Sequence, residues 1–289
     1  MDQEKLTELL RASAVAKHRP DRSPYTGLLL ADAQKIAKST GISLRHVESA
    51  ALACEIIPER YSRNQSSLSC ADQLRLLQCH VAIIGLGGLG GITAEILARL
   101  GVGQLTLIDG DVFDESNLNR QLLSSPARIG EKKATAACTR IQEINPAVEV
   151  LTIAEFFTAA NSEAILTNVH LAVDCLDTIP ARYVLQDACG KAAIPIVSGA
   201  IAGSSGQATT IFPGDPGFAL IYGAPGKARQ RGIEASQGTL PFAAVSMAAA
   251  LCAEATSILL GRSPQLRHRL LMADTIDHTS EILEFPERP

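Results

Sequence analysis

Short apolar runs and segments with helical periodicity alternate along the middle of this chain. The runs have the length and β-branched content of buried strands, and they occupy residues 81–84, 104–108, 148–153, 170–175 and 194–197. After the first run, Ile92, Ile96, Leu97 and Leu100 recur at helical spacing, and Gly101 follows as a stop signal. Such alternation is typical of a parallel sheet covered by helices. We therefore predict an α/β fold with a doubly wound, Rossmann-like sheet.

The two ends of the chain have different patterns. Near the N-terminus we expect three helices, at 2–17, 28–38 and 43–57, with a loop at 20–26. Near the C-terminus we expect a glycine-rich turn at 200–206, a strand at 207–212, an irregular loop at 213–240, a long apolar helix from 241, a strand at 269–272 and a polar tail. Ser43 is a good N-cap for the third helix. The prediction is a small helical appendage at 1–59 and a main domain at 60–289.

The appendage contains a spacing that resembles a DNA-binding helix-turn-helix, with Ile36, Gly41, Ser43 and Val47 as its markers. Its second helix carries Arg45 and His46 but also Glu48 and Glu55, so it lacks the basic face that DNA binding requires. The alternative is a small docking appendage, and nucleic-acid binding is not expected.

Composition narrows the class of protein further. The net charge is −4, which provides no bulk attraction to nucleic acid or to an anionic membrane. The seven cysteines form no C-x-x-C pair, so neither a disulfide framework nor a zinc site is indicated. The first ten residues lack the apolar core of a signal peptide. Polar residues interrupt the apolar stretch at 242–260, which favours a buried helix over a membrane span. We expect a cytoplasmic protein.

A nucleotide-binding motif joins the first strand to the first helix of the main domain. Gly85, Gly87 and Gly90 satisfy G-x-G-x-x-G, whose glycines let the backbone approach phosphate at a helix N-terminus. Asp109 ends the next strand, where a carboxylate can accept hydrogen bonds from ribose hydroxyls. An NAD-binding oxidoreductase would have the same features up to this point.

The polar residues that follow Asp109 favour ATP over a dinucleotide. Asp111, Asn117, Arg120 and Gln121 come within a dozen positions, as expected where phosphate charge is neutralised in place. A later helix begins at Lys132 and Lys133, where cations oppose the helix dipole. That placement favours a bound anion, with solvated lysines as the alternative. Asp177 follows the fourth strand and can hold Mg²⁺ or cap the next helix.

Taken together, GLGGLG, GVGQLTLIDGDVFDESNLNRQ and GEKK resemble the ubiquitin-activating-type adenylyltransferases, the ThiF/MoeB/HesA group. The resemblance covers roughly residues 60–275 and recurs at Arg60-Tyr-Ser-Arg63, Ile144-Asn145-Pro146, Asp174-Cys-Leu-Asp177, Arg182 and Gly206-Gln207. It implies Mg-ATP-dependent adenylation of a carboxylate with release of pyrophosphate. The usual acceptor is the C-terminal glycine of a small ubiquitin-like sulfur carrier, in molybdopterin or thiamine-type biosynthesis.

The resemblance also implies roles for individual residues. Phosphate contacts are implied for Gly85, Gly87, Gly90, Asn117, Arg120 and Lys133, a ribose contact for Asp109, and places in the nucleotide site for Asp111 and Gln121. Asp177 would hold Mg²⁺. Arg63 would reach the γ-phosphate of the other protomer, which implies a homodimer.

Two departures from the group refine the expectation. Relatives often bind zinc through two C-x-x-C pairs, but Phe218-Ala-Leu-Ile-Tyr222 replaces the first pair here, so no zinc is expected. Residues 213–251 contain no cysteine, which resembles members whose product is the acyl-adenylate itself.

Three alternative functions remain open. They are adenylation of a small-molecule or RNA carboxylate, an NAD-binding oxidoreductase, and a regulator with a degenerate ATP site.

Overall fold

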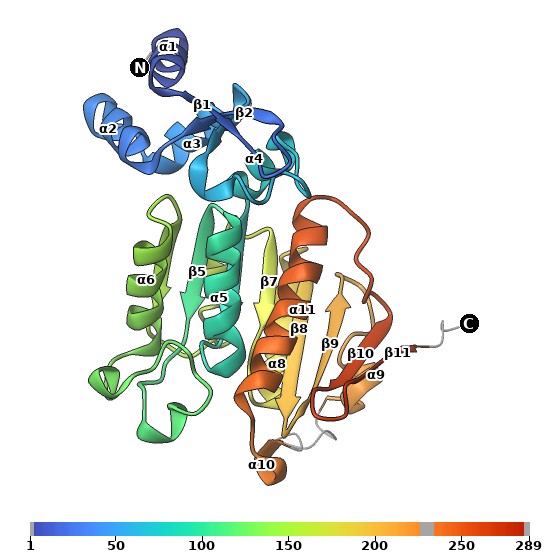
Figure 1. The fold of residues 1–289 in the computed structure, drawn as a ribbon. Coiled ribbons are helices and arrows are strands. Elements are labelled where there is room, and N and C mark those ends of the chain that lie inside the picture. Colours follow the sequence, from blue (N-terminus) through green and yellow to red (C-terminus); the bar gives the residue numbers. More distant parts are fainter. Residues whose placement is uncertain (1–2, 226–233, 286–289) are drawn as a thin grey trace.

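The computed structural model describes residues 3–225 and 234–285, and its centre is an eight-stranded sheet (Figure 1). Across the sheet the strands are β11 (Thr279–Glu284), β10 (Arg269–Asp274), β9 (Ser205–Ile211), β8 (Ile196–Ala202), β7 (Leu171–Asp174), β4 (His80–Ile84), β5 (Gln104–Ile108) and β6 (Glu149–Ile153). The five strands from β8 to β6 are parallel, and β9, β10 and β11 are added antiparallel at one side. The predicted α/β fold is confirmed.

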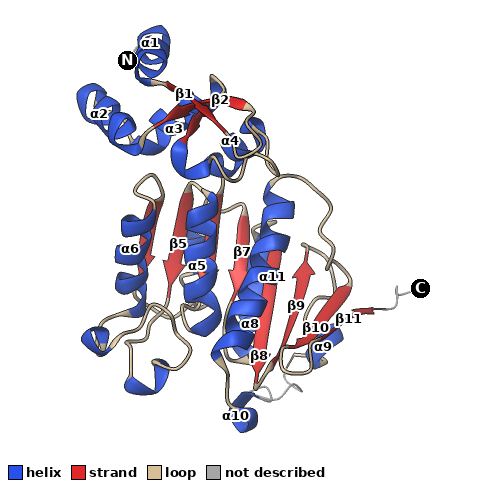
Figure 2. Ribbon diagram, in the orientation of Figure 1, coloured by secondary structure: helices blue, strands red, loops and turns tan. Residues whose placement is uncertain are grey.

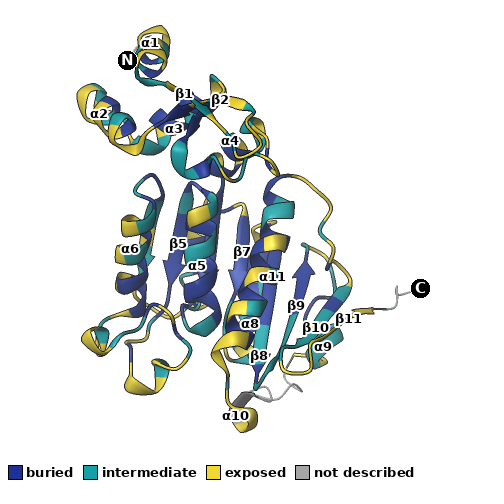
Figure 3. Ribbon diagram, viewed as in Figure 1, coloured by how far each residue is buried: buried dark blue, intermediate teal, exposed yellow. Residues whose placement is uncertain are grey.

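Alternate residues of β4 face opposite layers of helices. Val81 and Ile83 belong to the apolar cluster beneath α5 (Gly88–Leu100), α6 (Lys133–Ile144) and α11 (Pro241–Leu259). Ala82 and Ile84 belong to the cluster on the other face, with α7 (Ser162–Leu166) and α8 (Ile179–Lys191). Both faces are therefore covered, which explains the uninterrupted apolar runs of these strands. Figure 2 and Figure 3 show the buried strands between helices whose outer sides are exposed.

Helix α11 is the one helix in the described ranges long and apolar enough to cross a membrane. It packs instead against α5 and β8, and Ala244, Leu251 and Ala255 on it are fully buried. Its buried Glu254 accepts hydrogen bonds from the Thr210 hydroxyl and from two backbone N–H groups. The polar interruption of this helix is therefore satisfied within the core.

The N-terminal module is not purely helical, which corrects the prediction. It consists of α1 (Gln3–Ser13), β1 (Val15–His18), β2 (Pro24–Leu28), α2 (Leu30–Thr40), α3 (Leu44–Ala53) and β3 (Ile56–Pro58), and the three strands form a small sheet. Strands of three to five residues with mostly exposed or wholly buried side chains show no period-2 pattern, so the sequence does not reveal them. Ser43 caps α3 as predicted.

The module has its own apolar cluster, from Leu6 to Ile56. Its α3 faces the main domain, where Arg45 pairs with Glu149 at 2.8 Å and Glu48 is buried against Arg60. The helix that would enter a DNA groove is therefore used for intramolecular packing. The boundary between residues 59 and 60 remains a prediction.

Short elements and the C-terminus complete the fold. They are η1 (Glu59–Tyr61), α4 (Cys70–Gln78), η2 (Glu115–Asn117), η3 (Pro126–Arg128), α9 (Ala219–Tyr222) and α10 (Glu234–Gln237). β8 continues to Ala202, so the expected turn at 200–206 is a tight connection between two seven-residue strands. The tail expected to be polar contains a further strand, β11, whose side chains are all exposed.

Candidate nucleotide-binding site

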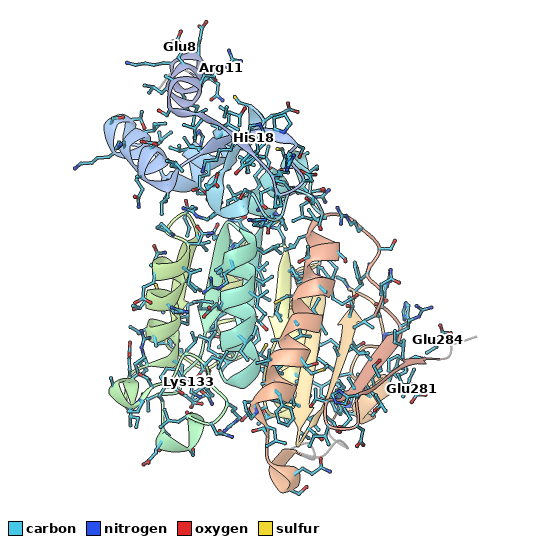
Figure 4. All side chains as sticks on the ribbon, viewed as in Figure 1. Glu8, Arg11, His18, Lys133, Glu281 and Glu284 are labelled. Atoms are coloured by element: carbon cyan, nitrogen blue, oxygen red, sulfur yellow. The ribbon has the colours of Figure 1, made fainter. Side chains whose placement is uncertain are left out.

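The main cleft lies where β4 and β7 end side by side. Helix α5 follows β4 and helix α8 follows β7, and these two helices pack on opposite faces of the sheet. The connections that leave the two strands therefore diverge, which opens a crevice between them. The cleft has a volume of about 1190 Å³. Figure 4 shows Lys133 at this end of the sheet, while Glu8, Arg11 and His18 mark the N-terminal module at the other. The predicted site residues that line the cleft are Gly85, Gly87, Asp109, Asp111, Asn117, Arg120, Gln121, Lys133 and Asp177.

The glycines of the loop meet different steric demands. Gly85 has a φ of 91°, and a Cβ there would lie 2.7 Å from the carbonyl oxygen of Cys175. Gly87 is the N-cap of α5 and faces the cleft. Gly90 does not line the cleft, and a Cβ on it would lie 1.8 Å from the Gly85 carbonyl oxygen. Gly90 thus permits close packing of α5 on β4, and of these three glycines only Gly85 and Gly87 line the cleft.

Asp109 braces the glycine loop as well as facing the cleft. Its Oδ2 accepts a hydrogen bond from the Leu86 N–H at 2.7 Å, and its Oδ1 accepts one from the Asp111 N–H at 2.8 Å. The residue is buried, so its position is fixed before any nucleotide binds. A carboxylate held in this way is suited to accept from ribose hydroxyls along its remaining lone pairs.

Lys133 begins α6 and forms an ion pair with Asp111. Its Nζ lies 3.0 Å from Oδ2 of Asp111, and its side chain is only 8% exposed. The alternative of a solvated lysine therefore does not hold for Lys133. The neighbouring Lys132 donates to the carbonyl oxygen of Gly110 at 2.8 Å. Asp111 thus serves in this structure as the partner of a cleft-lining cation.

The segment that follows β5 contains Asn117, Arg120 and Gln121, which line the cleft. Asn117 accepts from the Asp114 N–H in a capping box, and Arg120 donates to the Ser116 carbonyl at 3.1 Å. Gln121 is buried, and its Oε1 has no hydrogen-bond partner among the described residues. An unpaired acceptor in a cleft is suited to accept a hydrogen bond from a ligand, because burial without a partner is costly.

Asp177 is exposed just beyond β7. The N-cap of α8 is Thr178, without a side-chain capping bond, and no hydrogen bond to the Asp177 carboxylate is found within the described ranges. The capping alternative is therefore not supported. No cluster of three metal-ligating side chains occurs among the described residues, so Mg²⁺ here would rely on phosphate oxygens and water besides Asp177.

Arg182 is the buried residue whose role the sequence did not reveal. It donates to Oδ2 of Asp174 at 2.6 Å, to the Ser198 hydroxyl at 2.9 Å and to the Gly199 carbonyl at 2.9 Å. These bonds tie the end of β7 to β8, directly before the turn that carries Asp177. Its recurrence within the family resemblance was the available signal, but nothing in the spacing indicated this structural role.

Three cysteines of the main domain, of which Cys175 lines the cleft, are poor nucleophiles. Burial raises the pKa of Cys189 and of Cys252 to about 12, and it raises the pKa of Cys175 as well. A thiol with a raised pKa forms little thiolate at neutral pH. These three thiols are therefore unsuited to nucleophilic attack at neutral pH.

Arg63 lies outside the cleft of its own chain. Two residues earlier, Tyr61 packs against Gly101, and the next residue, Asn64, donates to Gln73 at 3.0 Å. Gly101 ends α5, while Gly87 begins it, and a helix of 13 residues is about 20 Å long. An arginine side chain does not span that distance, so the structure does not bring Arg63 together with the other predicted site residues.

The sequence profile of the ThiF family matches residues 61–289. The chain belongs to the ThiF family. It is 33% identical over 236 residues to the SAMP-activating enzyme E1 of Haloferax volcanii, covering 80% of this chain and 86% of the relative. It is 34% identical over 220 residues to the adenylyltransferase and sulfurtransferase MOCS3 of Sus scrofa, covering 75% of this chain. The chain spans only 48% of that relative's length. The predicted family and enzyme class, an adenylyltransferase, are confirmed.

Solved structures share the fold at lower identity. MccB of E. coli with ATP has a TM-score of 0.68 at 20% identity, covering 80% of this chain and 72% of that one. PaaA has a TM-score of 0.66 at 23% identity, covering 79% and 82%. The tRNA N6-threonylcarbamoyladenosine dehydratase TcdA of E. coli has a TM-score of 0.59 at 22% identity, covering 70% and 95%. These likenesses support the fold and do not specify a substrate.

Proposed function

We propose that this protein uses ATP and Mg²⁺ to adenylate the C-terminal glycine of a small ubiquitin-like sulfur carrier, with release of pyrophosphate. The observation that carries the proposal is the convergence of a glycine loop, Arg120, Lys133 and Asp177 on one cleft. A helix N-terminus and two cations suit a polyphosphate, and an exposed carboxylate suits its magnesium ion.

The chemistry requires positioning rather than proton transfer. The acceptor carboxylate is ionised at neutral pH, so one of its oxygens attacks the α-phosphorus without a general base. A bond from that oxygen to phosphorus forms while the bond from phosphorus to the pyrophosphate oxygen breaks. Arg120 and Lys133 neutralise phosphate charge, and Asp109 orients the ribose. Asp177 would hold a magnesium ion, which would supply further charge neutralisation.

The carrier is proposed on the basis of the relatives. One is named a SAMP-activating enzyme and the other an adenylyltransferase and sulfurtransferase, and both match the chain at more than 30% identity. A small-molecule or RNA carboxylate on the same fold is the rival acceptor. We further propose a cytoplasmic homodimer in which Arg63 of one protomer completes the site of the other, because its own cleft lies out of its reach.

The test is ATP–pyrophosphate exchange in the presence of a panel of sulfur carriers ending in Gly-Gly, with tRNA and small carboxylic acids as rival acceptors. Exchange stimulated by one carrier supports the proposal, and exchange stimulated only by a rival acceptor contradicts the carrier. Calorimetry should show Mg²⁺-dependent ATP binding with negligible NAD binding. Tighter binding of NAD than of ATP would overturn adenylation itself.

A further inference from the structure

Phe156 is a large apolar side chain left exposed at the edge of the cleft. Its exposed fraction is 64%, whereas the next residue, Phe157, is only 8% exposed and packs into the core cluster of one sheet face. Both residues line the cleft. Phe157 thus anchors the segment, while the ring of Phe156 remains available to a molecule in the cleft.

The ring of Phe156 lies beside the carboxylate predicted to hold ribose. The Asp109 N–H donates to the Ile153 carbonyl at 3.2 Å, which joins the ends of β5 and β6. From Ile153 the chain runs to Phe156, whose ring packs over Gly110, the residue after Asp109. A Cβ on Gly110 would lie 2.8–2.9 Å from three ring atoms. Gly110 is absent from the glycines with positive φ, so the space for the ring, rather than the backbone, requires glycine there.

The segment that presents the ring is braced. The Asn161 side-chain amide donates to the Phe156 carbonyl at 2.9 Å, and its oxygen accepts from the Thr158 N–H at 2.8 Å. Both bonds hold backbone groups on the two sides of Phe157. The ring of Phe156 is therefore presented from a defined position.

We propose that Phe156 is the stacking platform for the purine base of ATP. This inference rests on the proposed function, because it places the base of the same nucleotide. A base joined to a ribose at Asp109 would lie close to Gly110, over which the Phe156 ring packs, and both Asp109 and Phe156 line the same cleft. Stacking would cover an apolar face that is otherwise in water. For base–aromatic stacking in general, truncation of the ring to alanine weakens binding about 5- to 150-fold.

The first test compares ligands with and without a base. Calorimetry with Mg-ATP and with magnesium tripolyphosphate should show that Phe156→Ala weakens ATP binding within that range and leaves tripolyphosphate binding unchanged. Gly110→Ala should also weaken ATP binding selectively, because its Cβ displaces the ring. Phe242→Ala is the matched control, since Phe242 is 44% exposed but does not line the cleft.

The second test uses the absence of tryptophan from the sequence. Phe156→Trp introduces a single tryptophan that retains a stacking surface, so this variant should bind ATP with near wild-type affinity. Its fluorescence should change on addition of Mg-ATP and stay constant on addition of magnesium tripolyphosphate.

Four outcomes would contradict the proposals. Wild-type affinity of Phe156→Ala for ATP, or equal losses for ATP and tripolyphosphate, would overturn the stacking role alone. Unchanged Phe156→Trp fluorescence at saturating ATP would do the same. Failure of the wild-type protein to bind ATP would overturn the proposed function and the stacking role with it.

Discussion

The guanidinium of Arg60 donates a hydrogen bond to the side-chain oxygen of Asn145 at 2.9 Å, although 85 positions separate the two residues. Asn145 in turn donates to the Tyr61 hydroxyl and to the Ala98 carbonyl, both at 2.8 Å. The same guanidinium nitrogen pairs with Glu48 of the N-terminal module. Two motifs that are separate in the sequence therefore form one network, which joins the module to the main domain.

Arg60→Met should destabilise the protein by about 3–5 kcal/mol, because it leaves the Glu48 carboxylate buried without its counter-ion. Glu48 is 0% exposed, and its Oε2 has no hydrogen-bond partner among the described residues. Urea unfolding measures the change. Arg63→Met, an exposed site three positions away, is the control and should stay within about 0.5 kcal/mol of wild type. Equal free energies of unfolding for the two variants would show that the network contributes little to stability.

Asp177→Asn should leave the fold intact and remove most pyrophosphate exchange. The change keeps the shape of the side chain but removes the charge proposed to hold Mg²⁺. Loss of one preorganised electrostatic contact typically lowers the rate by about two to three orders of magnitude. Circular dichroism provides the control for folding. Near-normal exchange by the folded variant would exclude Asp177 as the essential metal ligand.

Arg63→Ala and Asp177→Asn should each be nearly inactive alone and should regain activity when mixed. If subunits exchange, about half of the dimers contain one site with both residues intact, which gives about a quarter of wild-type activity. A guanidinium pairs with phosphate oxygens through a rigid fork, so Arg63→Lys should not restore activity fully. Demonstrated subunit exchange without recovery would mean that Arg63 does not act across a subunit interface.

Acid should destabilise the protein through His80. Burial lowers the pKa of His80 below its ordinary value of 6.5, and Nε2 lies 2.7 Å from the Thr106 hydroxyl while Nδ1 lies 3.1 Å from the Asn168 carbonyl. A lower pKa in the folded state means that the unfolded state binds more protons in acid. The contribution of neutral His80 to the free energy of unfolding is therefore fully present above pH 6.5, and it is lost as the pH falls through the folded-state pKa.

Urea unfolding at several pH values between about 7.5 and 5 tests this, because exposed carboxylates remain largely ionised over that range. Wild type should lose stability on acidification, and His80→Gln should lose less over the same interval. His46→Gln, at an exposed position, should follow wild type. Parallel pH profiles for all three proteins would contradict the assignment to His80.

Cysteine replacement should affect stability and not chemistry. Variants with Cys175, Cys189 or Cys252 changed to alanine should form the acyl-adenylate in proportion to their folded fraction, which unfolding curves supply. The physical reason is burial, which keeps these thiols protonated. A thioester with the carrier, trapped on a non-reducing gel and abolished by one of these changes, would contradict the prediction.

The central sheet and most of the cleft were predictable because apolar periodicity and the glycine loop are local signals. Strands such as β4 are buried on both faces and read as apolar runs, and their carboxyl ends then bring Gly85 and Asp177 together through topology alone. The strands of the N-terminal module and β11 were not predicted because β1 and β11 are largely exposed and β3 has only three residues, all buried, so none shows an alternating pattern. Pairing with neighbours, which the sequence does not display, stabilises them.

Side-chain roles were harder to predict than positions. The sequence predicted that Asp111 and Lys133 belong to the site. It did not predict their ion pair of 3.0 Å, because the two residues are 22 positions apart. Gly90 fits the phosphate motif by spacing, yet the distance of 1.8 Å to the Gly85 carbonyl oxygen shows a packing constraint. Such roles depend on which atoms meet in three dimensions, and spacing alone does not determine them.

The N-terminal module lies at the amino-terminal ends of the parallel strands (Figure 1), whereas the residues that line the cleft follow the carboxyl ends of β4, β5 and β7. Each subunit therefore has one closed end and one open end. For Arg63 to complete a partner's site, the closed end of each subunit must lie beside the open end of the other. The two active sites would then lie at opposite ends of an antiparallel dimer. A substitution at the closed end would then affect the partner's site beside it, while the site of its own chain lies at the far end of the sheet.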